Sequence, residues 1–314
     1  MFNRRHLRIK VLHCFYAYFQ DDDKDLNHAD KQLKASLYKM YEMYIWLLSL
    51  VVEMQDHAID KIEAGRNKKL PSPEDLHPNT KFVTNSFIRL LANSKVLNSK
   101  CEELSVNWNQ EKDLSKNIFK ELIQTEDYKE YMESSERGFA HDKEFILRFF
   151  KRHMINVELL HDFFEEKSVL WTDDLDLSAG MAIKTIKTIS EDDADLALLP
   201  LWRDPEDEKN FLNNLFKKTL SLGEESEKLI AEAAKNWDFD RIALLDQILM
   251  KMAIAEAQTF KDIPLKVTLN EYIELSKYYS TPKSAGFING VLDQIFDKLK
   301  EDGKIKKTGK GLLE

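Results

Sequence analysis

Residues 240–299 read DRIALLDQILMKMAIAEAQTFKDIPLKVTLNEYIELSKYYSTPKSAGFINGVLDQIFDKL, and this stretch decides the fold. Its apolar residues recur at helical spacing in three runs, which Pro264 and Pro282 separate. Asp240 is predicted to cap the first helix, because its carboxylate can accept the free backbone N–H groups of a first turn. The pattern therefore predicts three short helices packed on one another.

The third run contains two glycines one turn apart, Gly286 and Gly290. In a helix interior each glycine costs about 0.8–1 kcal/mol relative to alanine. Two interpretations stay open at this point. Either another helix packs closely here, or a ligand or a second backbone approaches closely.

The same stretch resembles the C-terminal half of the NusB family of bacterial transcription antitermination factors. The matching positions, in chain order, are Leu245, Asp246, Leu249, Lys251, Glu256, Asp262, Ile263, Pro264, Lys266, Val267, Asn270, Glu271, Ile273, Glu274, Leu275, Lys277, Phe287, Asn289, Gly290, Val291, Leu292 and Asp293. The resemblance implies an all-α fold that binds RNA together with a ribosomal protein. It also implies that the chain has no enzyme activity.

The opening helix, expected over residues 3–20, carries cations where helices usually carry acids. Its first two turns contain Arg4, Arg5, His6, Arg8 and Lys10. Exposed cations at a helix N-terminus oppose the macrodipole and cost about 0.3–1 kcal/mol each, which an anion docked there would explain. Tyr16, on the flank of this helix, offers a stacking surface for a base. The alternative is a solvated basic turn with Tyr16 in the core.

This opening helix, RRHLRIKVLHCFYAYFQ, also resembles the arginine-rich first helix of NusB proteins. The resemblance implies an RNA-binding surface made of Arg4, Arg5, Arg8, Tyr16, Lys283, Phe287 and Asn289. His6 stands where the family often has arginine, and Lys283 replaces a usual acidic residue, so individual contacts differ from the family pattern. The implied partners are a boxA-like single-stranded RNA, the ribosomal protein NusE and the RNA polymerase antitermination complex.

Composition limits the classes of function. The net charge of −9 over 314 residues argues against a whole-surface nucleic-acid binder, so any RNA contact must be a local basic patch. Cys14 and Cys101 form no disulfide framework and fit a reducing compartment. No apolar run reaches the roughly 18 residues of a membrane span, and the start of the chain lacks a signal-peptide pattern. We therefore expect a cytoplasmic protein with no membrane contact.

The sequence contains no pattern typical of a catalytic or metal site. It has no nucleophile elbow, no P-loop and no dinucleotide fingerprint. Its histidines do not form an i, i+4 pair with a third ligand, and it lacks a CxxC motif. We therefore expect no enzyme, no cofactor and no metal.

The middle of the chain is material that typical NusB proteins lack. Residues 26–63 keep a helical period without proline or glycine and predict one long helix. Residues 65–78 are predicted to form a loop, and three more helical stretches are expected over residues 79–105, 108–132 and 139–168. Every proline falls at or outside a predicted helix end, which favours an all-α fold.

A weak internal repeat is present. DKEFILRFFKRH, from Asp142, precedes Trp171, and DEKNFLNNLFKK, from Asp207, precedes Trp237. Either a duplicated helical hairpin or chance similarity between amphipathic helices explains it. The best linker candidate is the acidic stretch from Glu191 to Asp195, followed by Pro200 and Pro205.

The chain is therefore divided into four parts. Residues 1–20 are expected to form the RNA-binding helix of a NusB-like bundle, and residues 21–200 a helical insertion, for which a duplicated helical hairpin is one interpretation. Residues 201–302 form the NusB-like C-terminal domain, and residues 303–314 a flexible basic tail.

The sequence thus predicts an all-α NusB-like bundle with an inserted helical subdomain. Its predicted function is RNA-binding transcription antitermination on rRNA operons, with a boxA-like RNA and NusE. One alternative is a stand-alone relative of the RNA-binding domain of rRNA cytosine methyltransferases, although no parallel-sheet nucleotide-binding pattern follows Leu299. The other is a helical protein–protein adaptor without an RNA role.

Overall fold

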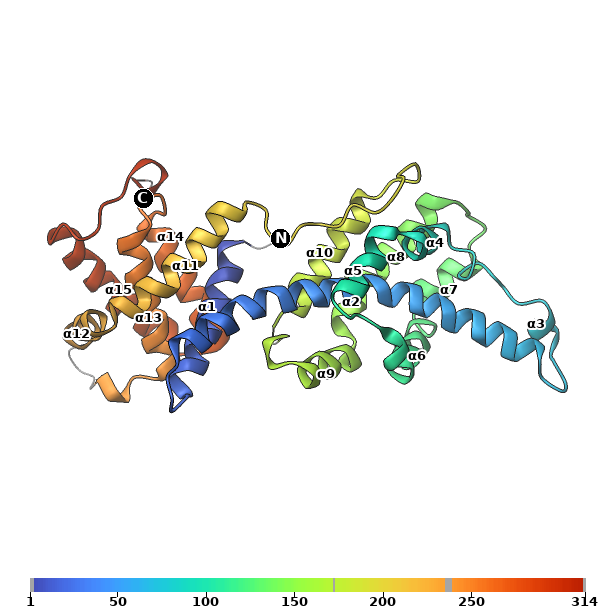
Figure 1. The fold of residues 1–314 in the computed structure, drawn as a ribbon, viewed down its shortest axis with the longest axis horizontal. Helices are drawn as coiled ribbons and strands as arrows, with labels where there is room; N and C mark the ends of the chain where they lie inside the picture. Colours follow the sequence, from blue (N-terminus) through green and yellow to red (C-terminus); the bar gives the residue numbers. More distant parts are fainter. Residues whose placement is uncertain (1–2, 172, 235–238, 313–314) are drawn as a thin grey trace. The chain divides into compact units, whose positions relative to one another are not determined.

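The computed structural model describes residues 3–171, 173–234 and 239–312, and in these ranges it contains helices and no strand (Figure 1). The predicted all-α class is therefore confirmed. The chain forms two compact units. The first unit comprises Met1–Lys34 and Trp202–Glu314, and the second comprises Ala35–Leu201.

The first unit is built around helix α13 (Leu244–Thr259). The helices that pack against it are α1 (Arg4–Gln20), α11 (Pro205–Ser221), α12 (Gly223–Ala233), α14 (Leu265–Tyr279) and α15 (Ser284–Glu301). Ala253, Ile254 and Ala255 are consecutive in α13 and all fully buried. A helix covered on every side is apolar all round rather than along one stripe, which is what residues 244–259 show.

The predicted cap at Asp240 is wrong. Asp240 lies in a separate 3₁₀ turn, η4 (Phe239–Arg241), and the N-cap of α13 is Ala243, which has no capping side chain. The amide of Gln247 instead donates to the carbonyl oxygens of Phe239 and Ile242, at 3.3 and 2.9 Å. A capping signal is local, whereas here a side chain from inside the helix holds the preceding turn.

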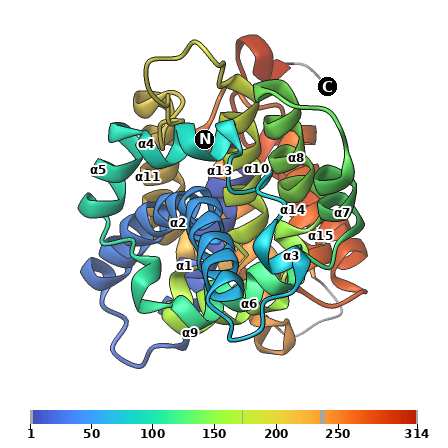
Figure 2. The ribbon, with the colours of Figure 1, turned by 90° about the vertical axis from the view of Figure 1, so that its right-hand side faces the viewer.

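The second unit is built around α2 (Leu26–Arg66), whose first residues belong to the first unit. The predicted long helix over residues 26–63 is confirmed. The other elements of this unit are α3 (Pro73–Leu76), α4 (Ser86–Asn93), α5 (Lys95–Glu103), η1 (Trp108–Gln110), α6 (Lys112–Leu122), α7 (Glu126–Glu133), α8 (Phe139–Arg152), η2 (Met154–Asn156), α9 (Glu158–Lys167), η3 (Val169–Trp171) and α10 (Leu175–Thr188). Figure 2 looks along α2, with α5 and α6 beside it.

Hydrogen bonds from neighbouring elements end on the buried middle of α2. The hydroxyl of Ser178 donates to the carbonyl of Met40 at 3.1 Å, and the indole N–H of Trp108 donates to the carbonyl of Trp46 at 3.2 Å. The hydroxyls of Tyr44 and Thr185 lie 2.6 Å apart. The second unit therefore has its own core, in which side chains from later helices bond to α2.

Each of the three helical stretches predicted after the loop is divided in two. The breaks fall at Ser94, Thr125 and Val157, whose backbones are extended. The hydroxyls of Ser94 and Thr125 accept a backbone N–H of the next helix and so cap it. The apolar period continues across these bends because both helices bury the same side, so spacing alone did not reveal them.

The segments that connect helices were predicted better than the bends within the predicted helical stretches. All seven prolines lie at or outside helix ends, and Pro73 and Pro205 begin helices α3 and α11. No helix lies between Thr188 and Pro205, where the linker was expected. Both copies of the weak repeat contain two successive helices, although Trp237 lies outside the described residues. The duplication and the four-part division stay predictions.

Candidate nucleic-acid interface

The start of α1 lies in a groove of the first unit. Asn3 caps the helix, because its side-chain oxygen accepts the backbone N–H of His6 at 3.0 Å. The groove is lined by Asn3, Arg4, Arg5, Arg8, Asp262, Ile263, Pro264, Val267, Glu271 and Lys310. Three of the arginines predicted from the sequence are therefore in one place, beside the start of α14.

Arg8 is the buried member of the three. Its side chain is 3% exposed and forms two hydrogen bonds of 2.7 Å to the carboxylate of Glu256, which is fully buried in α13. Glu256 also accepts the hydroxyls of Thr268 and Tyr272, at 2.9 and 3.0 Å. Burial alone would lower the pKa of Arg8, but the charge and hydrogen bonds of Glu256 outweigh it and raise that pKa. Arg8 thus stays charged inside the core.

Arg5 is the exposed member, with 45% of its side chain in solvent. Its guanidinium binds both carboxylate oxygens of Glu271 on α14, at 2.7 and 2.9 Å. These hydrogen bonds raise the pKa of Arg5 and lower the pKa of Glu271. Arg8 lies 3.4 Å from the same carboxylate, so Glu271 connects the buried and the exposed arginine.

Arg4 lies between two acidic residues on different elements. It is 3.1 Å from Asp207 of α11 and 3.2 Å from Asp262 in the loop before α14. Its guanidinium also lies 5.3 Å from the centre of the Phe211 ring, within the range of a cation–π contact. All three arginines therefore have acidic partners in the free protein.

The far end of α1 reaches the end of α14. The ring of His13 meets the ring of Tyr279 edge-on, with 5.2 Å between their centres. Tyr16, one turn beyond His13, is 42% exposed, so the interpretation that placed it in the core is not supported. His13 lies eight residues after Arg5 in α1, and its partner Tyr279 lies eight residues after Glu271 in α14. The two helices therefore run in the same direction.

The remaining predicted residues lie where α15 begins. Lys283 is exposed, and Phe287 and Asn289 are half-buried. The amide of Asn289 donates to the carboxylate of Asp293 one turn later, at 3.3 Å. Helix α15 begins five residues after Tyr279, so this group follows the end of α14 that α1 touches. The role of all seven residues in RNA binding stays a prediction.

The two glycines of α15 face open space. A Cβ added to Gly286 or to Gly290 would meet no atom within 4 Å, apart from the helix's own backbone and chain neighbours. Both residues are exposed. The interpretation that another helix of this chain packs on these glycines is therefore wrong. The other interpretation, in which a ligand or a second backbone approaches them, stays open.

Sequence reasoning missed the acidic residues that hold the arginines. Glu256, Glu271 and Asp262 appeared only as positions of the family motif, and Asp207 only as the start of the second repeat copy. Periodicity could have placed Glu256 on α13, but not beside a residue nearly 250 positions earlier. Lys310 was also missed, because the tail was expected to be flexible.

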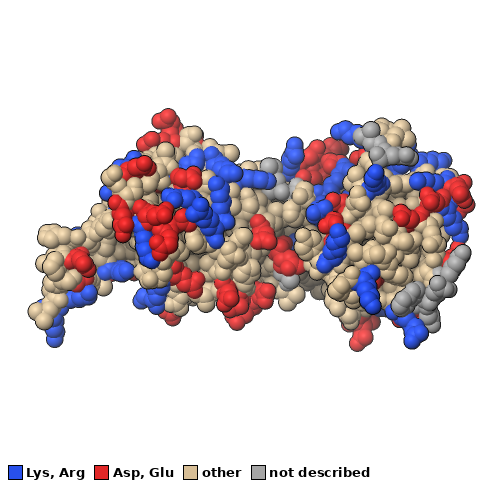
Figure 3. All heavy atoms as spheres, turned by 180° about the vertical axis from the view of Figure 1, so that it is seen from behind, with Lys and Arg blue, Asp and Glu red and all other residues tan. Residues whose placement is uncertain are grey.

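Charge on the surface is mixed. Figure 3 shows Lys and Arg interspersed with Asp and Glu over the face that it draws. Within the described ranges, no group of three or more histidine, cysteine or acidic side chains is placed to hold a metal ion. No helix in those ranges has the length and apolar character to cross a bilayer.

The fold and the groove define a class: an all-helical protein with arginines gathered at the start of its first helix. Comparison with known proteins narrows the class to a family. The sequence model of the NusB family matches residues 180–297. The transcription antitermination protein NusB of Salinibacter ruber is 42% identical over 128 residues, which are 40% of this chain and 80% of that protein. The chain belongs to the NusB family.

Two further relatives carry the same description. The NusB protein of Chloroherpeton thalassium is 39% identical over 106 residues, or 34% of this chain and 50% of the relative. That of Natranaerobius thermophilus is 36% identical over 89 residues, or 28% of this chain and 64% of the relative. No solved structure matches the chain. Helix α1 lies outside residues 180–297, so its likeness to the family's first helix stays a prediction.

Proposed function

We propose that this protein is an RNA-binding transcription antitermination factor that acts on rRNA operons. In this proposal a boxA-like single-stranded RNA binds at the start of α1, and the ribosomal protein NusE binds together with it in the RNA polymerase antitermination complex. NusB proteins are antitermination factors without enzyme activity, and the proposal extends that role to this chain. The observation that carries it is the gathering of Arg4, Arg5 and Arg8 in one groove.

The three arginines have different roles in this proposal. Arg5 and Arg4 are partly exposed, so a phosphate can replace Glu271 or Asp262 as their partner. Arg8 is buried on Glu256, so in this proposal it keeps its acidic partner and holds α1 in position against α13. Tyr16 and Phe287 supply stacking surfaces for bases, each of which contributes about 1–3 kcal/mol when a base stacks on it.

The exchange of a carboxylate for a phosphate gives the proposal a specific test. Arg5→Ala removes one phosphate contact and should reduce the slope of log affinity against log salt by about 0.7. Glu271→Gln leaves Arg5 in place but removes its competitor, and should raise RNA affinity. Filter binding with a boxA-like RNA and a scrambled RNA of equal length, over a range of KCl concentrations, measures both effects.

Replacing Arg8 is a poor test, because it would disturb the core. Lys120→Ala is a suitable control, since Lys120 is an exposed cation in the second unit. Wild-type affinity and an unchanged salt slope for folded Arg5→Ala protein would overturn the proposed site.

The joint action of RNA and NusE can be tested separately. If the two partners form one surface on this protein, RNA must raise the affinity for NusE by the same factor by which NusE raises the affinity for RNA. Titration of NusE with and without RNA measures this factor. Equal affinities would favour a protein–protein adaptor with independent binding.

A further inference from the structure

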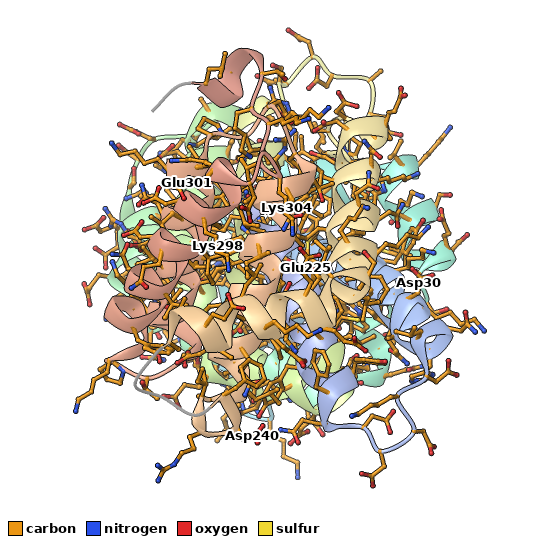
Figure 4. All side chains as sticks on the ribbon, turned by 90° about the vertical axis from the view of Figure 1, so that its left-hand side faces the viewer. Asp30, Glu225, Asp240, Lys298, Glu301 and Lys304 are labelled. Atoms are coloured by element: carbon orange, nitrogen blue, oxygen red, sulfur yellow. The ribbon has the colours of Figure 1, made fainter. Side chains whose placement is uncertain are left out.

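The C-terminal tail folds back onto the first unit after α15. Ile305 is buried, and the backbone N–H of Thr308 donates to the carbonyl of Lys261 at 2.9 Å. The ammonium of Lys307 donates to the carbonyl of Phe260 at 2.8 Å. Nearer to α15, Lys304 pairs with Glu225 of α12 at 2.6 Å, and Figure 4 shows these two residues near each other. The flexibility predicted for residues 303–314 stays a prediction, but residues 304–308 have defined contacts.

A glycine sets the position of the last turn, η5 (Gly309–Leu312). Gly311 is buried, and a Cβ added to it would overlap the carbonyl group of Lys261. The obstacle is backbone of the loop that follows α13, which cannot rotate away as a side chain would. Only glycine therefore lets η5 lie this close to the loop between α13 and α14.

This position brings Lys310 to the groove at the start of α1. Lys310 is exposed and lines the groove with Arg4, Arg5 and Arg8. The lining contains two carboxylates, those of Asp262 and Glu271, so Lys310 raises its cations from three to four. Each arginine is already paired with an acidic residue, whereas no described acidic residue pairs with Lys310. Lys310 can accept a phosphate without first losing a partner.

We propose that the C-terminal tail is part of the RNA site and that Lys310 contacts a phosphate of the bound RNA. This inference rests on the proposed function and adds a residue to the same site. A lysine suits this role, because its ammonium is a point charge on a flexible stem that can follow a phosphate. The tail places the ammonium of Lys310 at the groove, and the contacts of Gly311 and Thr308 with Lys261 fix its position.

The first test compares two lysines of the tail. Lys306 is exposed like Lys310 but does not line the groove, so Lys306→Ala is the matched control. Lys310→Ala should weaken binding of a boxA-like single-stranded RNA and lower its salt slope by about 0.7. Lys306→Ala should leave the slope unchanged. Equal slopes for both variants would overturn the proposal.

The second test keeps every charge. Gly311→Ala should displace η5 and carry Lys310 away from the groove, so it should weaken RNA binding about as much as Lys310→Ala. Wild-type RNA affinity in this variant would contradict the role of the tail. Arg5→Ala, measured in the same series, separates the two proposals. If Arg5→Ala lowers the slope and Lys310→Ala does not, the tail inference fails alone; if neither does, the RNA site fails with it.

Discussion

Glu256 of the first unit and Asp142 of the second are both buried carboxylates, but their partners differ. In the first unit, Glu256 is paired with the guanidinium of Arg8. In the second, Asp142 of α8 accepts the hydroxyl of Tyr131 at 2.7 Å, and the backbone N–H and hydroxyl of Ser86 at 2.7 Å each. The hydrogen bonds to the Asp142 carboxylate thus come from neutral donors, and the ammonium of Lys81 acts on it only through its charge.

The difference shows what the cation adds. Asp142 ties α8 to α7 and α4, and its hydrogen bonds stay inside the second unit. Glu256 instead holds Arg8, which shares Glu271 with the exposed Arg5. The buried pair of the first unit therefore orients the residues of the groove, while the network of the second unit joins helices. This comparison can be tested by substitution.

The largest effect is expected from Arg8→Ala. This change leaves the buried carboxylate of Glu256 without its cation. It should lower the free energy of unfolding by about 3–5 kcal/mol. Arg5→Ala, at the exposed pair, should cost no more than about 1 kcal/mol. Hydrogen exchange of amides in α13 measures the free energy of unfolding of the first unit. Similar costs for the two variants would show that Arg8 is no core residue.

A smaller effect is expected in the second unit from Tyr131→Phe. The change removes one donor to Asp142 but leaves both donors of Ser86, so the cost should be about 1–3 kcal/mol. Hydrogen exchange of amides in α8 gives the value. The control is Tyr128→Phe, because burial raises the pKa of Tyr128 to about 12 while no described residue accepts its hydroxyl. If Tyr131→Phe destabilises as much as Arg8→Ala, the contrast between Glu256 and Asp142 is wrong.

The smallest effect is expected in the pH dependence of the docking of the C-terminal tail. Burial lowers the pKa of Lys307 to about 8 from an ordinary value of 10.5. The docked tail therefore binds fewer protons than the undocked tail between these two values, and docking should strengthen as pH rises from about 8 to about 10.5. The ¹³Cα resonance of Gly311, which carries no exchangeable proton, reports the docked fraction. Lys307→Met should abolish this pH dependence, and a dependence that persists would assign it to another group.

The sequence predicted the helices better than their limits. Residues 26–63 gave one unbroken period and formed one helix, because a buried stripe in a single helix repeats without interruption. The helix breaks at Ser94 and Thr125 were not predicted, because the apolar spacing continues through both bends. Asp240 carried a capping signal that the fold did not use. These errors arise where a neighbouring side chain, rather than local spacing, decides the ends of a helix.

The sequence by itself determined the all-α class, the position of every proline relative to the helices and the likeness to the NusB family. These properties depend on local periodicity and on motif order, which are present in the chain before it folds. Only the tertiary structure decided that Arg8 is buried on Glu256, that Arg5 meets Glu271, and that Gly311 brings Lys310 to the groove. The physical reason is that an ion pair depends on distance and burial, and packing alone sets both for residues so far apart in the chain.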